Sequence, residues 1–100
     1  MFVKEASNVI SVKVGQAFRI RFWEDRTRGS RWQPTYDPAL FTLLSDDYQR
    51  TRNIRVDDVG MRYFEFVAIK EGRYEMAFEL RYGWKFAAED RSGYLIEVTP

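Results

Sequence analysis

The chain of 100 residues contains no cysteine and no histidine. Without cysteine there are no disulfides and no thiolate-bound metals, so a domain of this size must be held together by its apolar core. Without histidine the chain lacks the commonest general base, the usual partner of a nucleophilic serine and the commonest metal ligand. We therefore expect a protein that is not an enzyme and that uses no metal and no other cofactor.

Long apolar runs are also missing, because no stretch reaches the ~18 residues of a membrane-spanning helix. Residues 1–15 lack the basic start and apolar run of a signal peptide. We expect no membrane partner and a cytoplasmic location, or a periplasmic or secreted one if a signal peptide has been removed. The 16 basic and 15 acidic residues nearly cancel, so the net charge predicts no nucleic-acid partner.

Aromatic residues, by contrast, are plentiful, at 17% of a chain that is 45% hydrophobic and 31% charged, as in a soluble globular protein. Arginine supplies 12 of the 16 basic residues. This excess favours planar, stacking and bidentate contacts over solvated point charges.

Apolar side chains recur at every second position along much of the chain, which is the pattern of half-buried strands. Runs at 64–68 and 74–81 flank the turn Lys70-Glu71-Gly72 and predict a hairpin. Runs at 10–14 and 18–22 flank Gly15-Gln16, and 94–98 is a last strand. Residues 32–36 and 51–56 are weaker candidates, and 38–44 fits either a strand or a short helical turn.

About seven short strands separated by turn signals predict an all-β fold, an immunoglobulin-like antiparallel β-sandwich. No repeat, linker or low-complexity segment divides the sequence, so residues 1–100 are expected to form one monomeric domain. The polar or glycine-bearing stretches 24–30, 57–60 and 83–93 are predicted to be loops. Three such loops can gather at one end of a sandwich, which is a natural place for function.

Acidic residues occur in adjacent pairs, which raises the possibility of a glycosidase-like carboxylate pair or a calcium site. Adjacent side chains of an extended chain point to opposite faces, so we interpret these pairs as solvated loop charge. The pairs are Glu24-Asp25, Asp46-Asp47, Asp57-Asp58 and Glu89-Asp90.

Two tryptophans have different surroundings in the sequence. Trp32 lies at the start of a predicted central strand and is interpreted as a core residue. Trp84 follows Tyr82-Gly83 at the end of a strand, so it fits a contact residue on a loop as well as a packing residue. The arginine groups at 26, 28, 31 and at 50, 52, 55 are interpreted as solvated charge, with a binding surface as the alternative.

The order of these features resembles the chagasin family, inhibitors of papain-like cysteine proteases that are built on an immunoglobulin-like sandwich. The late region of the family has a glycine-rich loop, a strand, a lysine-containing turn ending in glycine, a second strand and then Arg-Pro-Trp. Residues 57–60, 64–68, 70–72, 74–80 and 82–84 are similar. The family's Asn-Pro-Thr-Thr-Gly loop, followed closely by tryptophan, is similar to residues 25–29 with Trp32 soon after.

The resemblance implies that three loops at one end form a wedge that enters the active-site cleft of a papain-like cysteine protease. Residues 27–29 would occlude the catalytic cysteine, and Trp84 would stack on an aromatic wall of the cleft. The protease-binding residues implied by the resemblance are Asp25, Arg26, Thr27, Arg28, Gly29, Asp58, Val59, Gly60, Tyr82, Gly83 and Trp84.

An alternative hypothesis follows from the loop residues that differ from the family pattern. Arg28 replaces a threonine, and an arginine in a narrow cleft costs several kcal/mol (~3–5) if it finds no partner. The alternative is a non-inhibitory chagasin-like module that contacts a protein, a glycan or an anionic partner through Arg26, Arg28 and Arg31.

Overall fold

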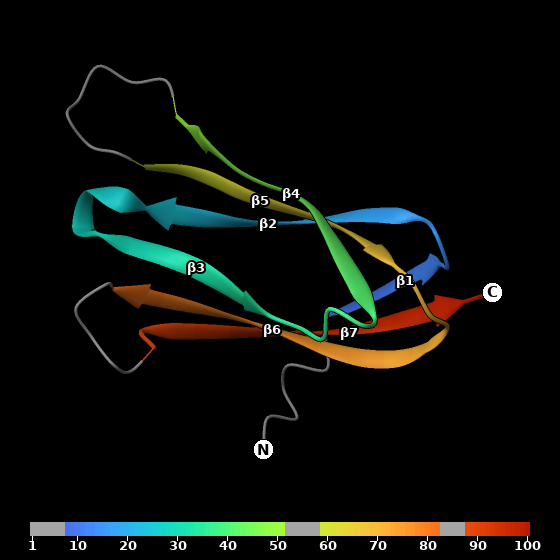
Figure 1. Cartoon of the computed structure of the whole chain (residues 1–100). Coiled ribbons are helices and arrows are strands. Elements are labelled where there is room, and N and C mark those ends of the chain that lie inside the picture. The colour runs from blue at the N-terminus through green and yellow to red at the C-terminus, as the bar shows by residue number, and fades with distance from the viewer. Residues whose placement is uncertain (1–7, 52–58, 83–87) are drawn as a thin grey trace.

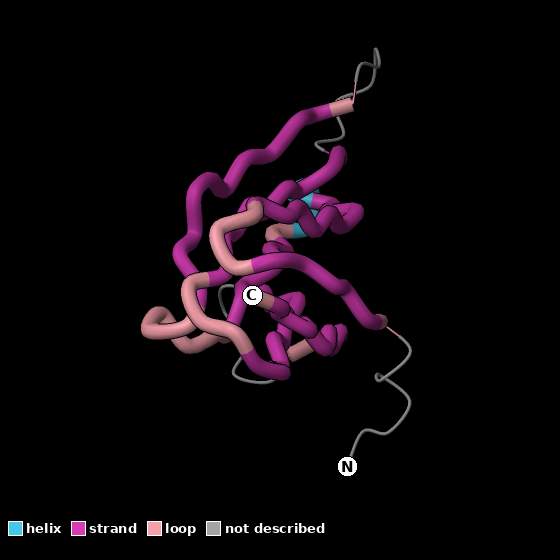
Figure 2. The backbone as a smooth tube through the Cα atoms, turned by 90° about the vertical axis from the view of Figure 1, so that its right-hand side faces the viewer, coloured by secondary structure: helices cyan, strands magenta, loops and turns pink. Residues whose placement is uncertain are grey.

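The computed structural model describes residues 8–51, 59–82 and 88–100. Within these residues the chain forms seven strands in two facing sheets, with strand orders β1-β7-β6-β3 and β2-β5-β4 (Figures 1 and 2). This architecture confirms the predicted all-β, immunoglobulin-like sandwich. The hairpin predicted for 64–68 and 74–81 was wrong, because the strands that contain these runs lie in different sheets and the turn at 70–72 crosses from one sheet to the other. The strands are β1 (Val9–Lys13), β2 (Ala17–Asp25), β3 (Ser30–Thr35), β4 (Phe41–Arg50), β5 (Val59–Ala68), β6 (Gly72–Tyr82) and β7 (Asp90–Thr99).

Strand pairing is antiparallel except between β1 and β7, which run parallel from the Val9–Leu95 pair to the Lys13–Thr99 pair. The expectation of a wholly antiparallel sandwich was therefore wrong at this edge. The turn after β1 leads directly into β2 of the other sheet, and Gly15 N–H donates to the carbonyl of Ala68 there (2.9 Å). Because this crossing lies where β7 ends, β1 must run in the same direction as β7.

The core between the sheets is aromatic. Phe41, Phe64, Phe66 and Phe78 are fully buried, and the ring of Phe22 stacks on Trp32 with their centroids 4.3 Å apart. Burial of Trp32 confirms that it is a core residue. Its strand, β3, is however at the edge of its sheet and not central.

Strand β4 extends much further than the sequence indicated. The ambiguous segment 38–44 divides into two parts: a turn, in which the Asp37 carbonyl accepts from the Leu40 and Phe41 amides (2.9 and 3.1 Å), and then the start of β4. Residues 45–50 are polar, but they pair with β5 along one edge, and no described strand pairs with their other edge. Of the weak strand candidate 51–56, only Thr51 lies within the described residues, and it follows β4.

The boundaries of the predicted loops also need correction. Glu24 and Asp25 belong to β2 because they pair with Gly60 and Val59 of β5, and Leu80 of β6 pairs with Asp90 of β7. Long-range pairing thus makes strand out of residues that are locally polar or glycine-bearing. Asp57 and Asp58 and residues 83–87 lie outside the described residues.

The same register brings several strand ends to one end of the sandwich, on the left in Figure 1. In one sheet Asp25, Val59 and Arg50 lie there, and in the other sheet Ser30, Tyr82 and Asp90 do. The described residues contain no helix that is long and apolar enough to cross a membrane.

Candidate functional site

The connection between β2 and β3 is a short 3₁₀ helix, η2 (Arg26–Arg28), which joins one sheet to the other at this end. The Asp25 carboxylate caps the turn by accepting from the Thr27 amide (3.0 Å), and the Gly29 amide donates to the Arg26 carbonyl (2.9 Å). Gly29 has a φ of 82°, in the left-handed region that favours glycine. The turn leaves Thr27, Arg28 and Gly29 exposed at its tip.

A buried carboxylate supports the base of this loop. The Glu24 side chain is fully buried, and its oxygens accept from the Trp32 amide (2.7 Å), Arg26 Nε (2.6 Å) and an Arg62 guanidinium nitrogen (2.8 Å). The interpretation of Glu24 as solvated loop charge was wrong. Three donors, two of them cationic, compensate for the water that the carboxylate loses on burial.

Arg62 extends this network across the sheet. Its guanidinium makes bidentate hydrogen bonds to the Asp46 carboxylate of β4 (2.5 and 2.9 Å) and also donates to Glu24 of β2. Burial lowers the pKa of Arg62, but the hydrogen bond to Asp46 and the charges of Glu24 and Asp46 outweigh it and raise the pKa above its ordinary value. Asp46 is therefore part of a strand and an ion pair, and not solvated loop charge as its adjacent pair had suggested.

The two arginines of the loop have different roles. Arg26 is half-buried, is bound to Glu24, and has its guanidinium carbon 3.8 Å from the ring centroid of Tyr48 on β4. Arg26 therefore fastens the loop to β4, in the β2-β5-β4 sheet. Arg28 is exposed, and its guanidinium carbon lies 5.8 Å from the ring centroid of Tyr82.

The other two groups of predicted protease-binding residues, 58–60 and 82–84, are only partly described. Val59 and Gly60 begin β5, and the Val59 carbonyl accepts from both the amide and the hydroxyl of Thr51 (2.8 and 2.9 Å). Gly60 is buried against the backbone of β4, so it does not lie in a loop as predicted. Tyr82 ends β6 and is buried. Asp58, Gly83 and Trp84 lie outside the described residues.

The supporting network of Glu24, Arg62, Asp46 and Tyr48 was missed by the sequence reasoning. A usable signal exists for two of its members. Glu24 continues the alternate positions of the core residues Ile20 and Phe22, and Arg62 is in phase with Phe64. A charged residue in phase with a core-facing run predicts a buried, paired charge.

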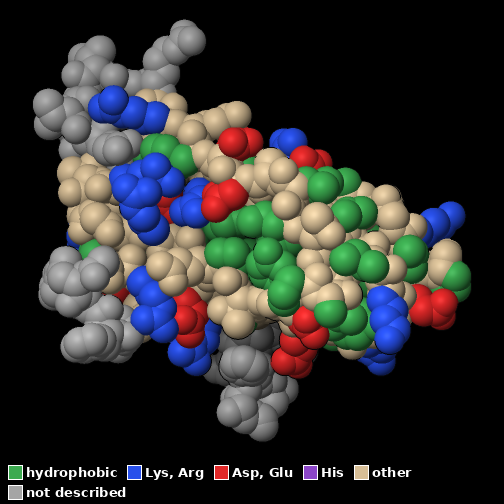
Figure 3. All heavy atoms as spheres, in the orientation of Figure 1, with side chains coloured by type: hydrophobic (Ala, Val, Ile, Leu, Met, Phe, Trp, Pro, Cys, Tyr) green, Lys and Arg blue, Asp and Glu red, His purple; other side chains and the backbone are tan. Residues whose placement is uncertain are grey.

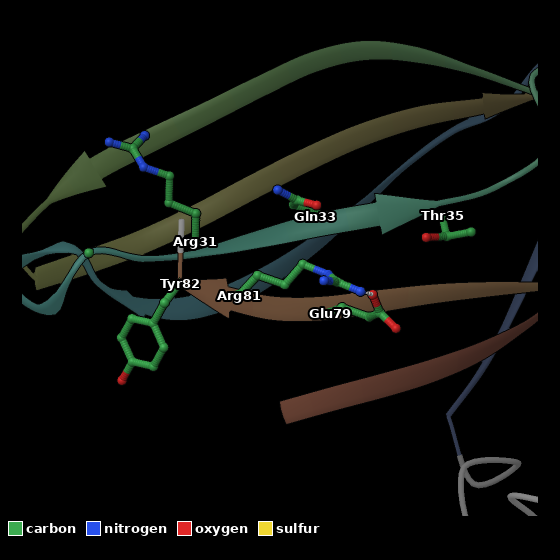
Figure 4. A pocket seen from close by; sticks show the side chains of 7 residues that line it. Arg31, Gln33, Thr35, Glu79, Arg81 and Tyr82 are labelled. Carbon is green, nitrogen blue, oxygen red and sulfur yellow. Dashed lines mark hydrogen bonds and ion pairs between the residues drawn. The ribbon is translucent and has the colours of Figure 1, made fainter. Parts of the chain in front are cut away.

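The outer face of β3 and β6 carries a shallow depression of about 520 Å³ that begins beside the loop, at Gly29 (Figure 4). Arg81 donates to the Glu79 carboxylate there (2.9 and 2.7 Å), and this hydrogen bond, together with the charges of Arg81 and Arg91, lowers the pKa of Glu79 although burial opposes the shift. Throughout the described ranges, no group of three or more acidic residues is placed to hold a metal ion.

A two-sheet sandwich with a short, internally fastened loop at one end has the form of a rigid binding domain. The model of the family described as "Chagasin family peptidase inhibitor I42" matches residues 11–98. The chain therefore belongs to the chagasin family of peptidase inhibitors. This match confirms the resemblance found in the sequence. Peptidase inhibition is therefore the function of the chain, and a peptidase is its partner.

Two solved structures are similar in fold. The cysteine protease inhibitor EhICP2 from Entamoeba histolytica matches with a TM-score of 0.83 and 15% identity, over 95% of this chain and 89% of that one. The solution structure of Amebosin matches with a TM-score of 0.73 and 15% identity, over 96% of this chain and 92% of that one. No curated protein sequence matches this chain.

Proposed function

We propose that the chain inhibits papain-like cysteine proteases by filling the active-site cleft with the loops at the η2 end of the sandwich. The observation that carries this proposal is the fastened loop of residues 26–29, which is capped by Asp25 and tied to the buried Glu24 through Arg26. A loop that is ordered before binding loses little conformational entropy when it binds. The similar fold of EhICP2, which is named a cysteine protease inhibitor, supports this choice of peptidase class.

The proposed contact surface comprises three segments. Thr27, Arg28 and Gly29 cover the catalytic cysteine, and Asp25 and Arg26 hold them in position. The flanking contacts come from Asp58 and Val59 on one side and from Gly83 and Trp84 on the other. The buried Gly60 and Tyr82 next to them in the sequence hold these flanks to their strands. The proposal is supported by the register, which brings the start of β5 and the end of β6 to the same end as η2.

The chain supplies shape and contacts in this proposal, and the target supplies the chemistry. We therefore propose that it is not an enzyme and that it needs no metal or cofactor. Residues 1–100 act as one domain, one copy per protease.

The direct experiment is a titration of papain, cathepsin L and cathepsin B with micromolar protein, with peptide-substrate hydrolysis as the readout. We expect a tight, reversible loss of activity for at least one of the three proteases. Full activity of all three at saturating protein would contradict the proposed function.

Gly29→Val tests whether the loop conformation carries the inhibition. A side chain at this left-handed position costs ~1–2 kcal/mol, so the turn after η2 is expected to change shape and the inhibition constant Ki to rise at least ~tenfold. The matched control is Gly15→Val, because Gly15 has a φ of 85°, also has open space around it, and lies at the opposite end of the sandwich. Both variants should lose similar stability in urea, and only Gly29→Val should lose inhibition. Equal Ki values for the two variants would show that the loop is not the contact surface.

A further inference from the structure

The depression on the outer face of β3 and β6 is continuous with the proposed protease-binding loop. It runs along β3 from Gly29, the residue that closes the loop, to Thr35, and it is bordered on β6 by Glu79 and Arg81. Arg31 lines it only two residues after Gly29, a separation of ~7 Å along a strand. A protease that covers the loop tip can therefore also reach the mouth of the depression.

Among the described residues that line this depression there are two arginines, Arg31 and Arg81, and one carboxylate, that of Glu79. Arg31 and Arg81 lie directly opposite each other in the β3–β6 register, an arrangement in which like charges repel. The Glu79 carboxylate is shared by Arg81 (2.7 Å) and by Arg91 of β7 (2.8 Å). The Glu79 carboxylate is thus already bound by two guanidinium groups, and Arg31 is not bound to it.

Arg31 is the member of this group that is available to a ligand. It is exposed, and within residues 8–51, 59–82 and 88–100 no hydrogen bond, ion pair or ring contact involves its side chain. Figure 4 shows Arg81 extending along β6 toward Glu79 while Arg31 points away from both. Basic side chains are also visible on the surface at this end of the molecule (Figure 3).

We infer that this depression is a carboxylate-binding subsite that receives an acidic side chain from the rim of the target protease's cleft. The inference rests on the proposed function, and it adds a preference for proteases with an aspartate or glutamate beside the cleft. A guanidinium offers a planar pair of donors that matches a carboxylate. Gln33 adds an amide on the same face, and Arg31, which no described carboxylate neutralises, supplies the guanidinium for the ligand.

The principal test is the charge reversal Arg31→Glu, measured against whichever of papain, cathepsin L and cathepsin B the unaltered chain inhibits. Ki is expected to rise ~tenfold or more, mostly through slower association, and its dependence on salt is expected to weaken. The matched control is Arg21→Glu, which makes the same change of charge on an exposed position of β2, in the opposite sheet. Equal Ki values for Arg31→Glu and the unaltered chain would overturn the subsite and leave the proposed function standing.

A charge exchange identifies the partner residue. Acidic residues at the cleft rim of the inhibited protease are changed one at a time to lysine. One of them is expected to weaken inhibition by the unaltered chain and to restore most of the inhibition lost in Arg31→Glu. If no lysine variant distinguishes the two inhibitors, the carboxylate is not supplied by the protease and the inference is wrong.

A binding measurement without a protease separates failure of the subsite from failure of the proposed function. The chain is titrated with a blocked tetraglutamate peptide, with blocked tetraglutamine as the control, and amide shifts are followed by NMR. We expect saturable shifts at Arg31, Gln33 and Arg81 with tetraglutamate only, and their loss in Arg31→Glu. Shifts with both peptides, or with neither, would overturn the subsite. Shifts as expected in a chain that inhibits no protease would overturn the proposed function alone.

Discussion

Glu24 is the residue on which the position of the η2 loop depends. Its carboxylate lies between the sheets, where an unpaired charge would be costly, and it is held by donors from the loop, from β3 and from β5. Arg26 and Arg62 both donate to this one carboxylate. Loss of Glu24 would therefore remove an ion-pair partner from two guanidinium groups at once. Removal of any one member of the network should therefore cost more free energy than its own contacts contribute, since a buried ion pair is much less costly than a single buried charge.

Glu24→Ala is accordingly expected to lower the free energy of unfolding by ~3–5 kcal/mol, the usual cost of breaking a buried ion pair. Urea denaturation followed by tryptophan fluorescence measures this change. Glu75→Ala, at an exposed position on β6, is the control and should change stability by no more than ~0.5 kcal/mol. If both variants unfold at the same urea concentration, the network does not stabilise the fold.

At the scale of elements, the contact between β4 and β5 decides how the loop is supported. β4 is an edge strand whose described hydrogen-bonding partner is β5 alone, yet it carries Asp46 and Tyr48, which hold Arg62 and Arg26. A Cβ atom at Gly60 would collide with the Gln49 carbonyl oxygen and lie 2.8 Å from the Arg50 Cα. Only glycine therefore permits the two strands to pair at the loop end.

Gly60→Ala should separate the ends of β4 and β5 and destabilise the chain by ~1–3 kcal/mol through overpacking. Native-state hydrogen exchange is expected to show faster exchange of the β4 amides at 46–50 than of the β6 amides, whose neighbours do not change. Ki against an inhibited protease should rise as well, because Tyr48 and Asp46 move with β4. Gln49→Ala, which keeps the backbone and removes an exposed side chain, is the control. If hydrogen exchange becomes faster by the same factor in β4 and β6, Gly60 acts only on the global stability of the chain.

At the scale of the whole molecule, the strand edges that no described strand covers determine whether the chain can self-associate. The edges are β1 and β3 in one sheet and β2 and β4 in the other. Pro34 within β3 has no amide hydrogen to offer to another strand, and β4 has a register shift between Leu43 and Ser45 followed by two aspartates. Proline, irregular pairing and charge at an edge all oppose edge-to-edge association.

We therefore expect a monomer of 12.0 kDa. Sedimentation equilibrium at micromolar to submillimolar protein concentration should fit this single mass. A dimer within this range would contradict the monomer prediction. It would also require the strand edges, and not the loop end, to be considered as an interaction surface.

Many of the strands could be predicted from local sequence patterns alone. Alternation of apolar residues identified the strands at 10–14, 18–22, 64–68, 74–81 and 94–98, because side chains of a strand point alternately to its two faces. It could not show which strands pair, and the hairpin predicted around Lys70-Glu71-Gly72 was wrong because β5 and β6 lie in different sheets. The sequence also pointed to the loop at 25–29 and to the chagasin family. The polar strand 45–50 could not be read in this way, since it is an edge strand whose state depends on pairing with β5.

The sequence by itself thus determined the all-β class, the aromatic core and the family, all of which follow from local patterns and from the order of motifs. Only the tertiary structure decided that Glu24 is buried, that its partner Arg62 lies 38 positions away, and that Arg31 is opposite Arg81 in the strand register. The physical reason is that alternation reports which face a residue occupies. Whether a charge on that face is paired, repelled or available to a ligand depends on the residue that a different strand places opposite it.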